Sequence, residues 1–343
     1  MSLQRITLAG VSRRQMLQGA ASLAGLALAG WGSGSAQAAT GVRFQLNWIR
    51  NVQFGGMWYA LEKGFYRDEG LDVQFNGGGP GVDPISLVAN QSALVGFNSN
   101  VISVILARSR GVPLVAFGVQ FQKSPNCLVC RADSGIQGPS DFLGKRIAVQ
   151  GVGRASLGVV LRVLNIAEDQ VRLVNTGFDV SSLLTDQADL LTAFSTNQPL
   201  QMRAVGVEPR IFLYHDLGFE QQALPMLTTE QVLETQPDLL EALLRATIKG
   251  WEYAIANPEE VAELTVRKYS EGLDLEQQIG ENLAQIELMQ IGVAAEKGLF
   301  WMDRSIWEQT LRVGREFGLI LDLPNLDDLL RYEILERVYG TSA

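Results

Sequence analysis

Trp48 and Asn51 are the residues whose types and spacing best suit the binding of a flat molecule. The apolar run Val42–Trp48 predicts a buried strand, and the polar residues Arg50 and Asn51 follow it. In open α/β sheets, small molecules bind beyond the carboxyl ends of the strands. There an indole can stack on a flat ring while an amide hydrogen-bonds to it. The alternative is that Trp48 belongs to the core, as large aromatic residues often do.

The same rule selects residues after the other predicted strands. In the first half of the chain they are Gly79, Asn98, Ser99, Gln120 and Phe121, and in the second half Gly153, Ser156, Phe178, Asn197 and Gln198. The glycines at 77–79 would let backbone N–H groups approach an anion or a carbonyl oxygen, or they could simply form a turn. Asn98 and Ser99 could cap a helix or donate to a ligand. These residues predict a binding site without a catalytic residue.

The reactive residue types are few. Cys127 and Cys130 match a C-x-x-C pattern, but they lie in a predicted strand, where residues three apart point to opposite faces. We therefore expect a buried strand and no disulfide or metal site. His215 is the single histidine, which excludes a histidine-rich metal centre, and we interpret it as a hinge or surface residue rather than a base. No cofactor is expected.

Three tryptophans and a stretch of acidic residues have simpler interpretations. Trp251, Trp301 and Trp307 fall on apolar helical faces and are expected to pack in the core. The acidic residues between Glu252 and Glu287 predict a solvated helical face.

Short apolar runs alternate with amphipathic segments, which predicts two successive α/β sets and a parallel sheet in each. The predicted strands are Val42–Trp48, Leu71–Phe75, Ala93–Phe97, Leu114–Val119, Cys127–Arg131, Ile147–Gln150, Val171–Val174 and Leu190–Phe194. The predicted helices between them are Gln53–Lys63, Pro84–Asn90, Val101–Arg110, Ala155–Asn165, Ser181–Gln187 and Gln198–Val205. From Thr229 onward the pattern is helical, with Pro237–Asn257, Asp303–Phe317 and Leu326–Val338 as the main segments.

The fold class is therefore α/β, with two α/β lobes joined by hinge strands and a helical C-terminal segment. A chain of 343 residues is longer than one core usually supports. We place the first lobe at 39–123 plus 224–343 and the second at 124–223. The net charge of −9 argues against nucleic acid and against anionic membrane surfaces as partners.

Several blocks of sequence carry a family resemblance. They are 45–60 (QLNWIRNVQFGGMWYA), 62–73, the Gly77–Pro80 turn, 134–145 and Phe194–Pro199. In this order they resemble the thiamine-precursor-synthase-like family of substrate-binding proteins of ABC transporters. The resemblance implies a type II periplasmic binding protein fold, capture of a small molecule between two lobes, and delivery to an ABC permease in the inner membrane. We expect a monomer.

The resemblance also suggests a ligand class, a pyrimidine or riboflavin-like vitamin precursor. Gln198 stands where relatives often have Glu, and Phe54, which we include among the candidate ligand-binding residues, stands where pyrimidine-binding relatives often have His. Both differences suggest a larger or less basic ligand. One alternative is a sulfonate or nitrate, for which Arg50 and Arg154 are the candidate contacts. Another is an enzyme like the fungal pyrimidine synthase, which uses pyridoxal phosphate and a cysteine-rich motif; this chain lacks that motif.

The first 38 residues have the layout of a secretory signal peptide. Arg13 and Arg14 precede the uncharged apolar stretch Met16–Trp31, and Ala36 and Ala38 suit signal peptidase. The paired arginines favour the twin-arginine (Tat) pathway over Sec. A membrane anchor is the alternative, but the apolar run is short and contains glycines. No cysteine suitable for lipidation lies near the cleavage point, so we expect a soluble protein of a periplasm.

Overall fold

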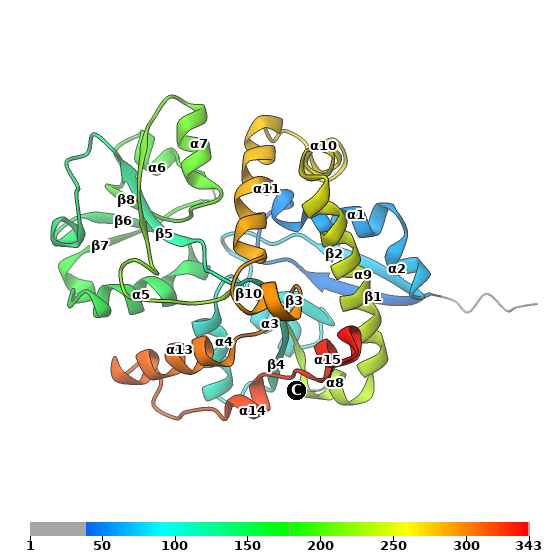
Figure 1. Cartoon of the computed structure of the whole chain (residues 1–343). Helices are drawn as coiled ribbons and strands as arrows, with labels where there is room; N and C mark the ends of the chain where they lie inside the picture. Colours follow the sequence, from blue (N-terminus) through cyan, green and yellow to red (C-terminus); the bar gives the residue numbers. More distant parts are fainter. Residues whose placement is uncertain (1–38, 178, 342–343) are drawn as a thin grey trace, which may run out of the picture. The chain divides into compact units, whose positions relative to one another are not determined.

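The computed structural model describes residues 39–177 and 179–341, and they contain two five-stranded sheets (Figure 1). We call the part built on the first sheet lobe 1 and the part built on the second sheet lobe 2. The order in lobe 1 is β2-β1-β3-β10-β4, with β1 Thr40–Gln45, β2 Leu71–Asn76, β3 Val95–Phe97, β4 Leu114–Phe121 and β10 Ala223–Thr229. The order in lobe 2 is β7-β6-β8-β5-β9, with β5 Asn126–Arg131, β6 Arg146–Val149, β7 Arg172–Asn175, β8 Leu190–Phe194 and β9 Pro209–Leu213.

Both sheets are mixed, so the prediction of parallel sheets was wrong in one strand of each. β1, β2 and β3 are parallel, whereas β10 runs antiparallel to β3 and β4. In lobe 2, β6, β7 and β8 are parallel, and β5 runs antiparallel to β8 and β9. The reason lies in the connections: β5 enters lobe 2 from β4, and β10 returns to lobe 1 after β9. The chain thus passes between the lobes at 122–125 and at 214–222.

Helices follow most strands, as the alternating pattern predicts. In lobe 1 these are α1 Gly55–Glu62, α2 Phe65–Asp68, α3 Pro84–Ala89 and α4 Val101–Ser109, and in lobe 2 α5 Arg154–Val163, α6 Ser181–Leu184 and α7 Gln198–Ala204. Short 3-10 turns add η1 Val52–Phe54, η2 Pro139–Phe142, η3 Gly151–Gly153 and η4 Glu168–Gln170. Asp83 caps α3 by accepting from the Ile85 amide at 3.1 Å, and Gly64 follows α1 in the left-handed region with φ 77°.

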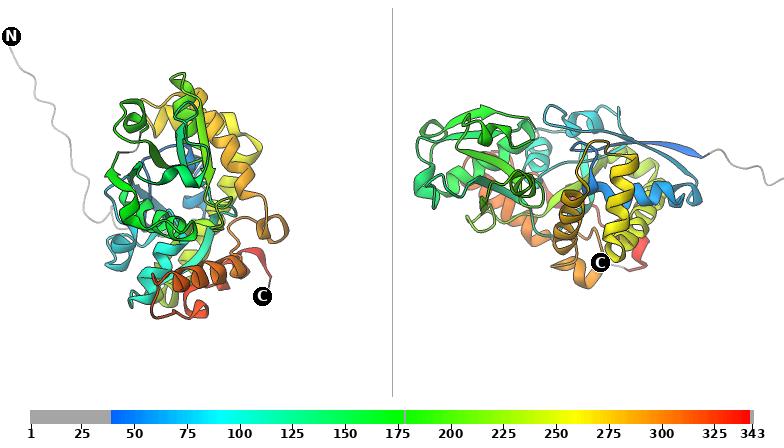
Figure 2. Two further views of the ribbon diagram at one scale, coloured as in Figure 1. Left: turned by 90° about the vertical axis from the view of Figure 1, so that its left-hand side faces the viewer. Right: turned by 90° about the horizontal axis from the view of Figure 1, so that it is seen from above.

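The C-terminal third is helical, as predicted. It contains α8 Glu230–Thr235, α9 Pro237–Ala256, α10 Pro258–Lys268, α11 Leu275–Met289, α12 Val293–Lys297, α13 Arg304–Glu316, α14 Leu326–Leu329 and α15 Glu333–Tyr339. α9 crosses α1 closely at Gly56 and Gly250, where a Cβ on Gly250 would lie 2.1 Å from the Gly56 carbonyl oxygen. α10 and α11 run side by side (Figure 2). α11 packs on α10, η1 and β4 of lobe 1, and it also contacts α7 of lobe 2.

The predicted helix Leu326–Val338 is in fact two helices. Leu330 forms a parallel bridge with Ala116 of β4, and the Arg331 amide donates to the Ala116 carbonyl at 2.9 Å. This pairing with the edge strand requires an extended backbone, and it interrupts the helix between α14 and α15.

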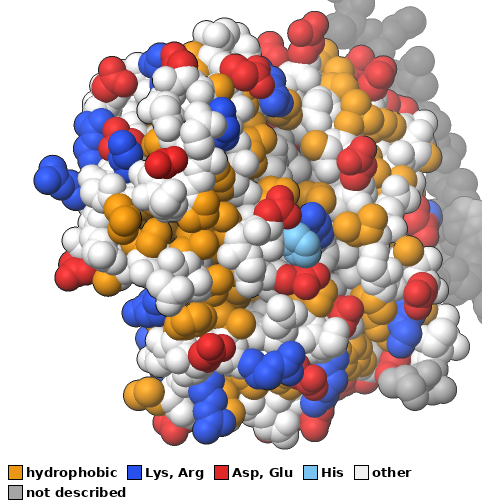
Figure 3. Space-filling view, turned by 60° about the vertical axis from the view of Figure 1, so that its left-hand side comes forward, with side chains coloured by type: hydrophobic (Ala, Val, Ile, Leu, Met, Phe, Trp, Pro, Cys, Tyr) orange, Lys and Arg blue, Asp and Glu red, His pale blue; other side chains and the backbone are white. Residues whose placement is uncertain are grey.

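Most of the residues with simple interpretations lie as expected. Cys127 and Cys130 are buried on β5 and unpaired with each other, and burial raises the pKa of both thiols. Trp251, Trp301 and Trp307 are buried, but the expectation of a helical face was wrong for Trp301, which lies in the loop between α12 and α13. His215, pale blue in Figure 3, lies at the surface on the return connection, with its Nδ1 atom 3.8 Å from Glu220. Among the described residues, none of the helices has the length and apolar character needed to cross a membrane.

Candidate functional site

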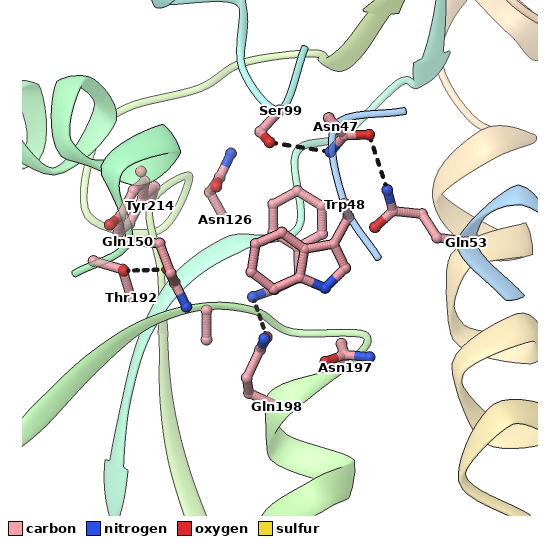
Figure 4. Close-up of a pocket in the computed structure, with 13 residues that line it drawn as sticks. Asn47, Trp48, Gln53, Ser99, Asn126, Gln150, Thr192, Asn197, Gln198 and Tyr214 are labelled. Atoms are coloured by element: carbon pink, nitrogen blue, oxygen red, sulfur yellow. Dashed lines mark hydrogen bonds between the residues drawn. The ribbon is translucent and has the colours of Figure 1, made fainter. Parts of the chain in front are cut away.

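A cavity lies between the two lobes, at the ends of β1, β3, β6 and β8 (Figure 4). The space between its lining atoms, including solvent at its mouth, measures about 490 Å³. Its lining consists of Asn47, Trp48, Gln53 and Ser99 from lobe 1 and of Asn126, Gln150, Gly153, Thr192, Ala193, Phe194, Asn197, Gln198 and Tyr214 from lobe 2. This mixture of aromatic and amide groups is typical of a small-molecule site.

The lobe 1 wall consists of a tryptophan beside polar side chains that hydrogen-bond to one another. Asn47 donates to the Ser99 hydroxyl at 3.0 Å, and Gln53 donates to the Asn47 side-chain oxygen at 3.3 Å. These bonds join three segments of lobe 1: the loop after β1, η1 and the loop after β3. Trp48 is 9% exposed and directs its indole into the cavity (Figure 4). It therefore borders both the core and the cavity, which reconciles the two interpretations of its role.

Gly78 supports the Trp48 segment from behind. The Gly78 amide donates to the Trp48 carbonyl at 2.9 Å. A Cβ on Gly78 would lie 2.3 Å from the Leu46 carbonyl oxygen and 2.6 Å from the Trp48 nitrogen. Only glycine permits so close an approach of the two loops. Of the glycines that suggested an anion-binding loop, Gly78 therefore packs against the tryptophan loop.

The lobe 2 wall presents amides anchored mainly within lobe 2. Thr192 on β8 donates to the Gln150 side-chain oxygen at 2.9 Å. The Gln198 side-chain oxygen accepts from the Phe194 amide at 2.9 Å, which fixes the first turn of α7 against the end of β8. The Asn197 side-chain oxygen accepts from Gln201 at 2.9 Å. The Tyr214 ring closes the wall, and burial raises the pKa of its phenol.

The lining is uncharged. Among the described residues around the cavity there is no Lys, Arg, Asp, Glu or His. A buried anion would need a cation or several converging N–H groups, and a buried cation would need a carboxylate. The arrangement suits a neutral ligand that is flat enough to lie on Trp48 and rich enough in donors and acceptors to use the amides.

A buried carboxylate stands directly behind this wall. Glu281 on α11 is 2% exposed, and its Oε2 atom accepts from Asn197 at 2.5 Å and from Gln278 at 3.1 Å. Its Oε1 atom accepts from Asn51 at 2.9 Å. Burial raises the pKa of Glu281 to about 7, while the three amide donors act in the opposite direction. The prediction that the acidic residues here form a solvated face was therefore wrong for Glu281.

Five of the residues selected from the sequence line the cavity: Trp48, Ser99, Gly153, Asn197 and Gln198. Three others lie one contact behind it. Asn51 binds Glu281, Gln120 donates to the Gln53 carbonyl at 2.9 Å, and the Phe121 ring lies 6.5 Å from the Phe194 ring, centre to centre.

Four more lie away from the lining. Phe54 is fully buried in the core against Phe97, and Asn98 accepts from the Asn100 amide in a turn. Gly79 is in the loop after β2, and Ser156 is buried in the first turn of α5. Phe178 lies outside the described residues.

Eight lining residues were not selected: Asn47, Gln53, Asn126, Gln150, Thr192, Ala193, Phe194 and Tyr214. Asn47 and Gln150 could have been found, because each lies at the end of a predicted strand. Thr192 and Ala193 lie inside β8, and Asn126 and Tyr214 flank the connections between the lobes. No local pattern distinguishes these four residues.

The two mixed sheets and the cavity between them define a type II periplasmic binding protein fold. The solved alkanesulfonate-binding protein SsuA from Xanthomonas axonopodis pv. citri, bound to MOPS, has this fold. It matches with a TM-score of 0.67 and 12% identity over 85% of this chain and 98% of that chain. Residues 51–261 match the NMT1/THI5-like family model, and the chain belongs to this family.

Three relatives cover most of the chain. The riboflavin-binding protein RibY of Chloroflexus aurantiacus is 25% identical over 81% of this chain and 81% of its own length. The formylaminopyrimidine-binding protein of Halalkalibacterium halodurans is 26% identical over 82% of this chain and 90% of its own. The 4-amino-5-hydroxymethyl-2-methylpyrimidine phosphate synthase of Legionella pneumophila is 25% identical over 65% of this chain and 72% of its own length.

Proposed function

We propose that this protein is the substrate-binding component of an ABC importer and that it captures a neutral, flat heterocycle of the riboflavin or aminopyrimidine type. The single observation that carries the proposal is the uncharged, amide-rich cavity beside Trp48. The family membership and the two binding-protein relatives support the class of function. In this proposal the ring stacks on Trp48, and the amides of both lobes bind its edges as the lobes close.

The lining favours a neutral heterocycle over a sulfonate or nitrate. The two arginines that could have bound an anion are engaged elsewhere: Arg50 donates to the Phe75 carbonyl at 2.8 Å, and Arg154 lies 3.5 Å from Glu168. Neither lines the cavity. The likeness to sulfonate-binding proteins concerns the fold, and their ligand does not transfer with it.

Capture also fits the cavity better than catalysis. A synthase that uses pyridoxal phosphate needs a lysine for the Schiff base, and general acid–base catalysis needs a group whose pKa lies near the working pH. The lining residues include no lysine, and their one titratable side chain is Tyr214, whose pKa burial raises. We therefore propose binding without chemistry for this chain, in contrast to the synthase relative.

The proposed function also requires export of the protein and a membrane transporter that receives the ligand. We propose export by a cleaved signal peptide within residues 1–38, which lie outside the described residues, by the Tat pathway to a periplasm. There the protein would act as a soluble monomer that delivers its ligand to an ABC permease. We also keep the proposed lobe limits, 39–123 plus 224–343 and 124–223; the strands of the two sheets are compatible with them.

A thermal-shift panel tests the ligand class. Riboflavin and formylaminopyrimidine represent neutral heterocycles, and taurine and nitrate represent small anions. A ligand at 100 times its Kd stabilises the folded state by about 2.7 kcal/mol, a readily measured shift. We expect at least one heterocycle, and neither anion, to raise the Tm. A shift with taurine or nitrate alone would contradict the proposal.

A further inference from the structure

Glu281 joins the two lobes behind the cavity. Its helix, α11, packs mainly on lobe 1, and there Oε1 binds the Asn51 side chain. On the opposite side Oε2 binds Asn197, which belongs to lobe 2 and lines the cavity. The carboxylate is therefore a direct hydrogen-bonded link from lobe 1 to a ligand-facing residue of lobe 2.

The link also reaches the lobe 1 wall. The Asn51 side-chain oxygen accepts from the backbone N–H of Gln53 at 3.2 Å. The side chain of Gln53 belongs to the polar network of the lobe 1 wall. The Asn51 carbonyl accepts from the Trp58 indole at 2.8 Å, which ties this loop to the core. One buried carboxylate is thus bonded directly to Asn197 in the lobe 2 wall and, through Asn51, is connected to Gln53 in the lobe 1 wall.

Within the part of the chain that the structure describes, no cation compensates the carboxylate. Its described partners Asn51, Asn197 and Gln278 are all neutral amides. The other charged residues of the surrounding helices are exposed: Arg203 on α7, Glu276 and Glu287 on α11, and the five charged residues of α10 between Glu259 and Lys268. η1 and β4 contribute no charged residue. A carboxylate buried without a countercharge favours its protonated form.

We propose that Glu281 is a positioning residue that clamps the two lobes together, and that it takes up a proton when the cleft closes on its ligand. The proposal rests on the proposed function, because closure is the binding step. Opening the cleft would separate Asn197 from Glu281 and admit water, which stabilises the ionised form. Closing it removes that water. An Asn amide can serve either form, since its oxygen accepts from a protonated carboxyl and its nitrogen donates to an ionised one.

The direction of the pH effect follows from the raised pKa. We assign the described arrangement, in which Asn197 meets Glu281, to the closed state. There burial raises the pKa of Glu281 to about 7, whereas a Glu carboxyl group in water has a lower, ordinary pKa. The closed state therefore binds the proton more tightly, and affinity rises as the pH falls toward the ordinary value. By linkage we expect riboflavin to bind about tenfold more tightly at pH 6 than at pH 8.

Isothermal titration calorimetry with riboflavin at pH 6.5, in two buffers of different ionisation enthalpy, measures the proton uptake. We expect roughly 0.5 to 1 proton for the wild type and for the control E287Q, which changes an exposed residue of the same helix. E281Q should take up almost none. The wild type and E281Q differ only at position 281, so the difference in their proton uptake isolates this residue. Uptake near zero in the wild type, or equal uptake in E281Q, would overturn the proposal.

A second measurement separates this proposal from the ligand assignment. Without ligand, small-angle X-ray scattering follows the radius of gyration of the wild type and of E281Q from pH 8.5 to pH 5. Because the closed state binds the proton more tightly, the wild type should become more compact relative to E281Q as the pH falls through about 7. If riboflavin gives no heat but the difference in radius of gyration changes with pH, riboflavin is not the ligand and the role of Glu281 as a clamp stands. If riboflavin binds without proton uptake and the difference in radius of gyration is constant, Glu281 is not the clamp and the proposed function stands.

Discussion

The two walls of the cavity are built differently. In lobe 1, the polar side chains Asn47, Gln53 and Ser99 bond to one another, and Gly78 fixes the Trp48 loop through the backbone. All these contacts stay within lobe 1. In lobe 2, Asn197 depends on Glu281, whose helix packs mainly on the other lobe.

This difference indicates which wall is preorganised. Because its contacts stay within lobe 1, we expect the lobe 1 wall to keep its shape whether the cleft is open or closed, so that Trp48 serves as a fixed platform. In the lobe 2 wall, we expect Asn197 to reach its described position only when it meets Glu281. A preorganised platform lowers the entropy cost of binding. A wall that is completed only in the closed state lets the bound ligand shift the equilibrium toward that state.

Removal of the platform should have the largest effect. In Trp48→Ala the stacking surface is lost, and we expect riboflavin affinity to fall by about 2–4 kcal/mol, the range of a buried aromatic anchor. Trp48→Phe retains a flat ring and should lose much less. Quenching of flavin fluorescence measures both. If Trp48→Ala bound as tightly as the wild type, Trp48 would be a core residue and not the platform.

Disruption of the support behind the platform should have the next largest effect. The Cβ of Gly78→Ala would clash with the backbone at Leu46 and Trp48, so we expect a loss of about 1–3 kcal/mol in the free energy of unfolding, with weaker binding. Gly77→Ala is the matched control, because its Cβ would meet nothing nearer than the Arg50 guanidinium at 4.0 Å. Urea denaturation compares the two variants. Equal stability would show that the close approach of the loops does not hold the wall.

A change in the lobe 2 wall should have the smallest effect. Thr192→Val removes the hydroxyl that donates to Gln150 and leaves the amide oxygen without that partner, which costs about 1 kcal/mol. We expect riboflavin affinity to fall about fivefold, whereas Thr192→Ser should bind like the wild type. A loss of riboflavin affinity as large as that of Trp48→Ala would contradict the larger contribution that we assign to the lobe 1 wall.

The strand-end rule predicted part of this site because it depends on local information. Trp48, Ser99 and Asn197 follow or flank strands whose apolar runs are evident in the sequence. The rule failed where the position depends on pairing between distant segments. Tyr214 reaches the cavity only because β9 pairs with β5, and neither β9 nor β10 has a pattern that we recognised.

Glu281 illustrates the same limit. On a helix with acidic neighbours, its sequence context is that of a solvated face, and nothing local distinguishes it from Glu287. Its burial arises from the packing of α11 against η1 and α7, and its partner Asn197 lies 84 positions away in the sequence. Similarly, the break between α14 and α15 depends on the bridge to β4.

Capture of a neutral heterocycle is tested by a competition titration of the purified protein with riboflavin. We expect saturable, one-to-one quenching of flavin fluorescence. Formylaminopyrimidine should reduce the quenching by competing for the same cavity, and excess taurine or nitrate should leave it unchanged. The quenching should be absent in Trp48→Ala. If neither heterocycle bound while taurine or nitrate did, the claim that this uncharged cavity captures a neutral heterocycle would be contradicted.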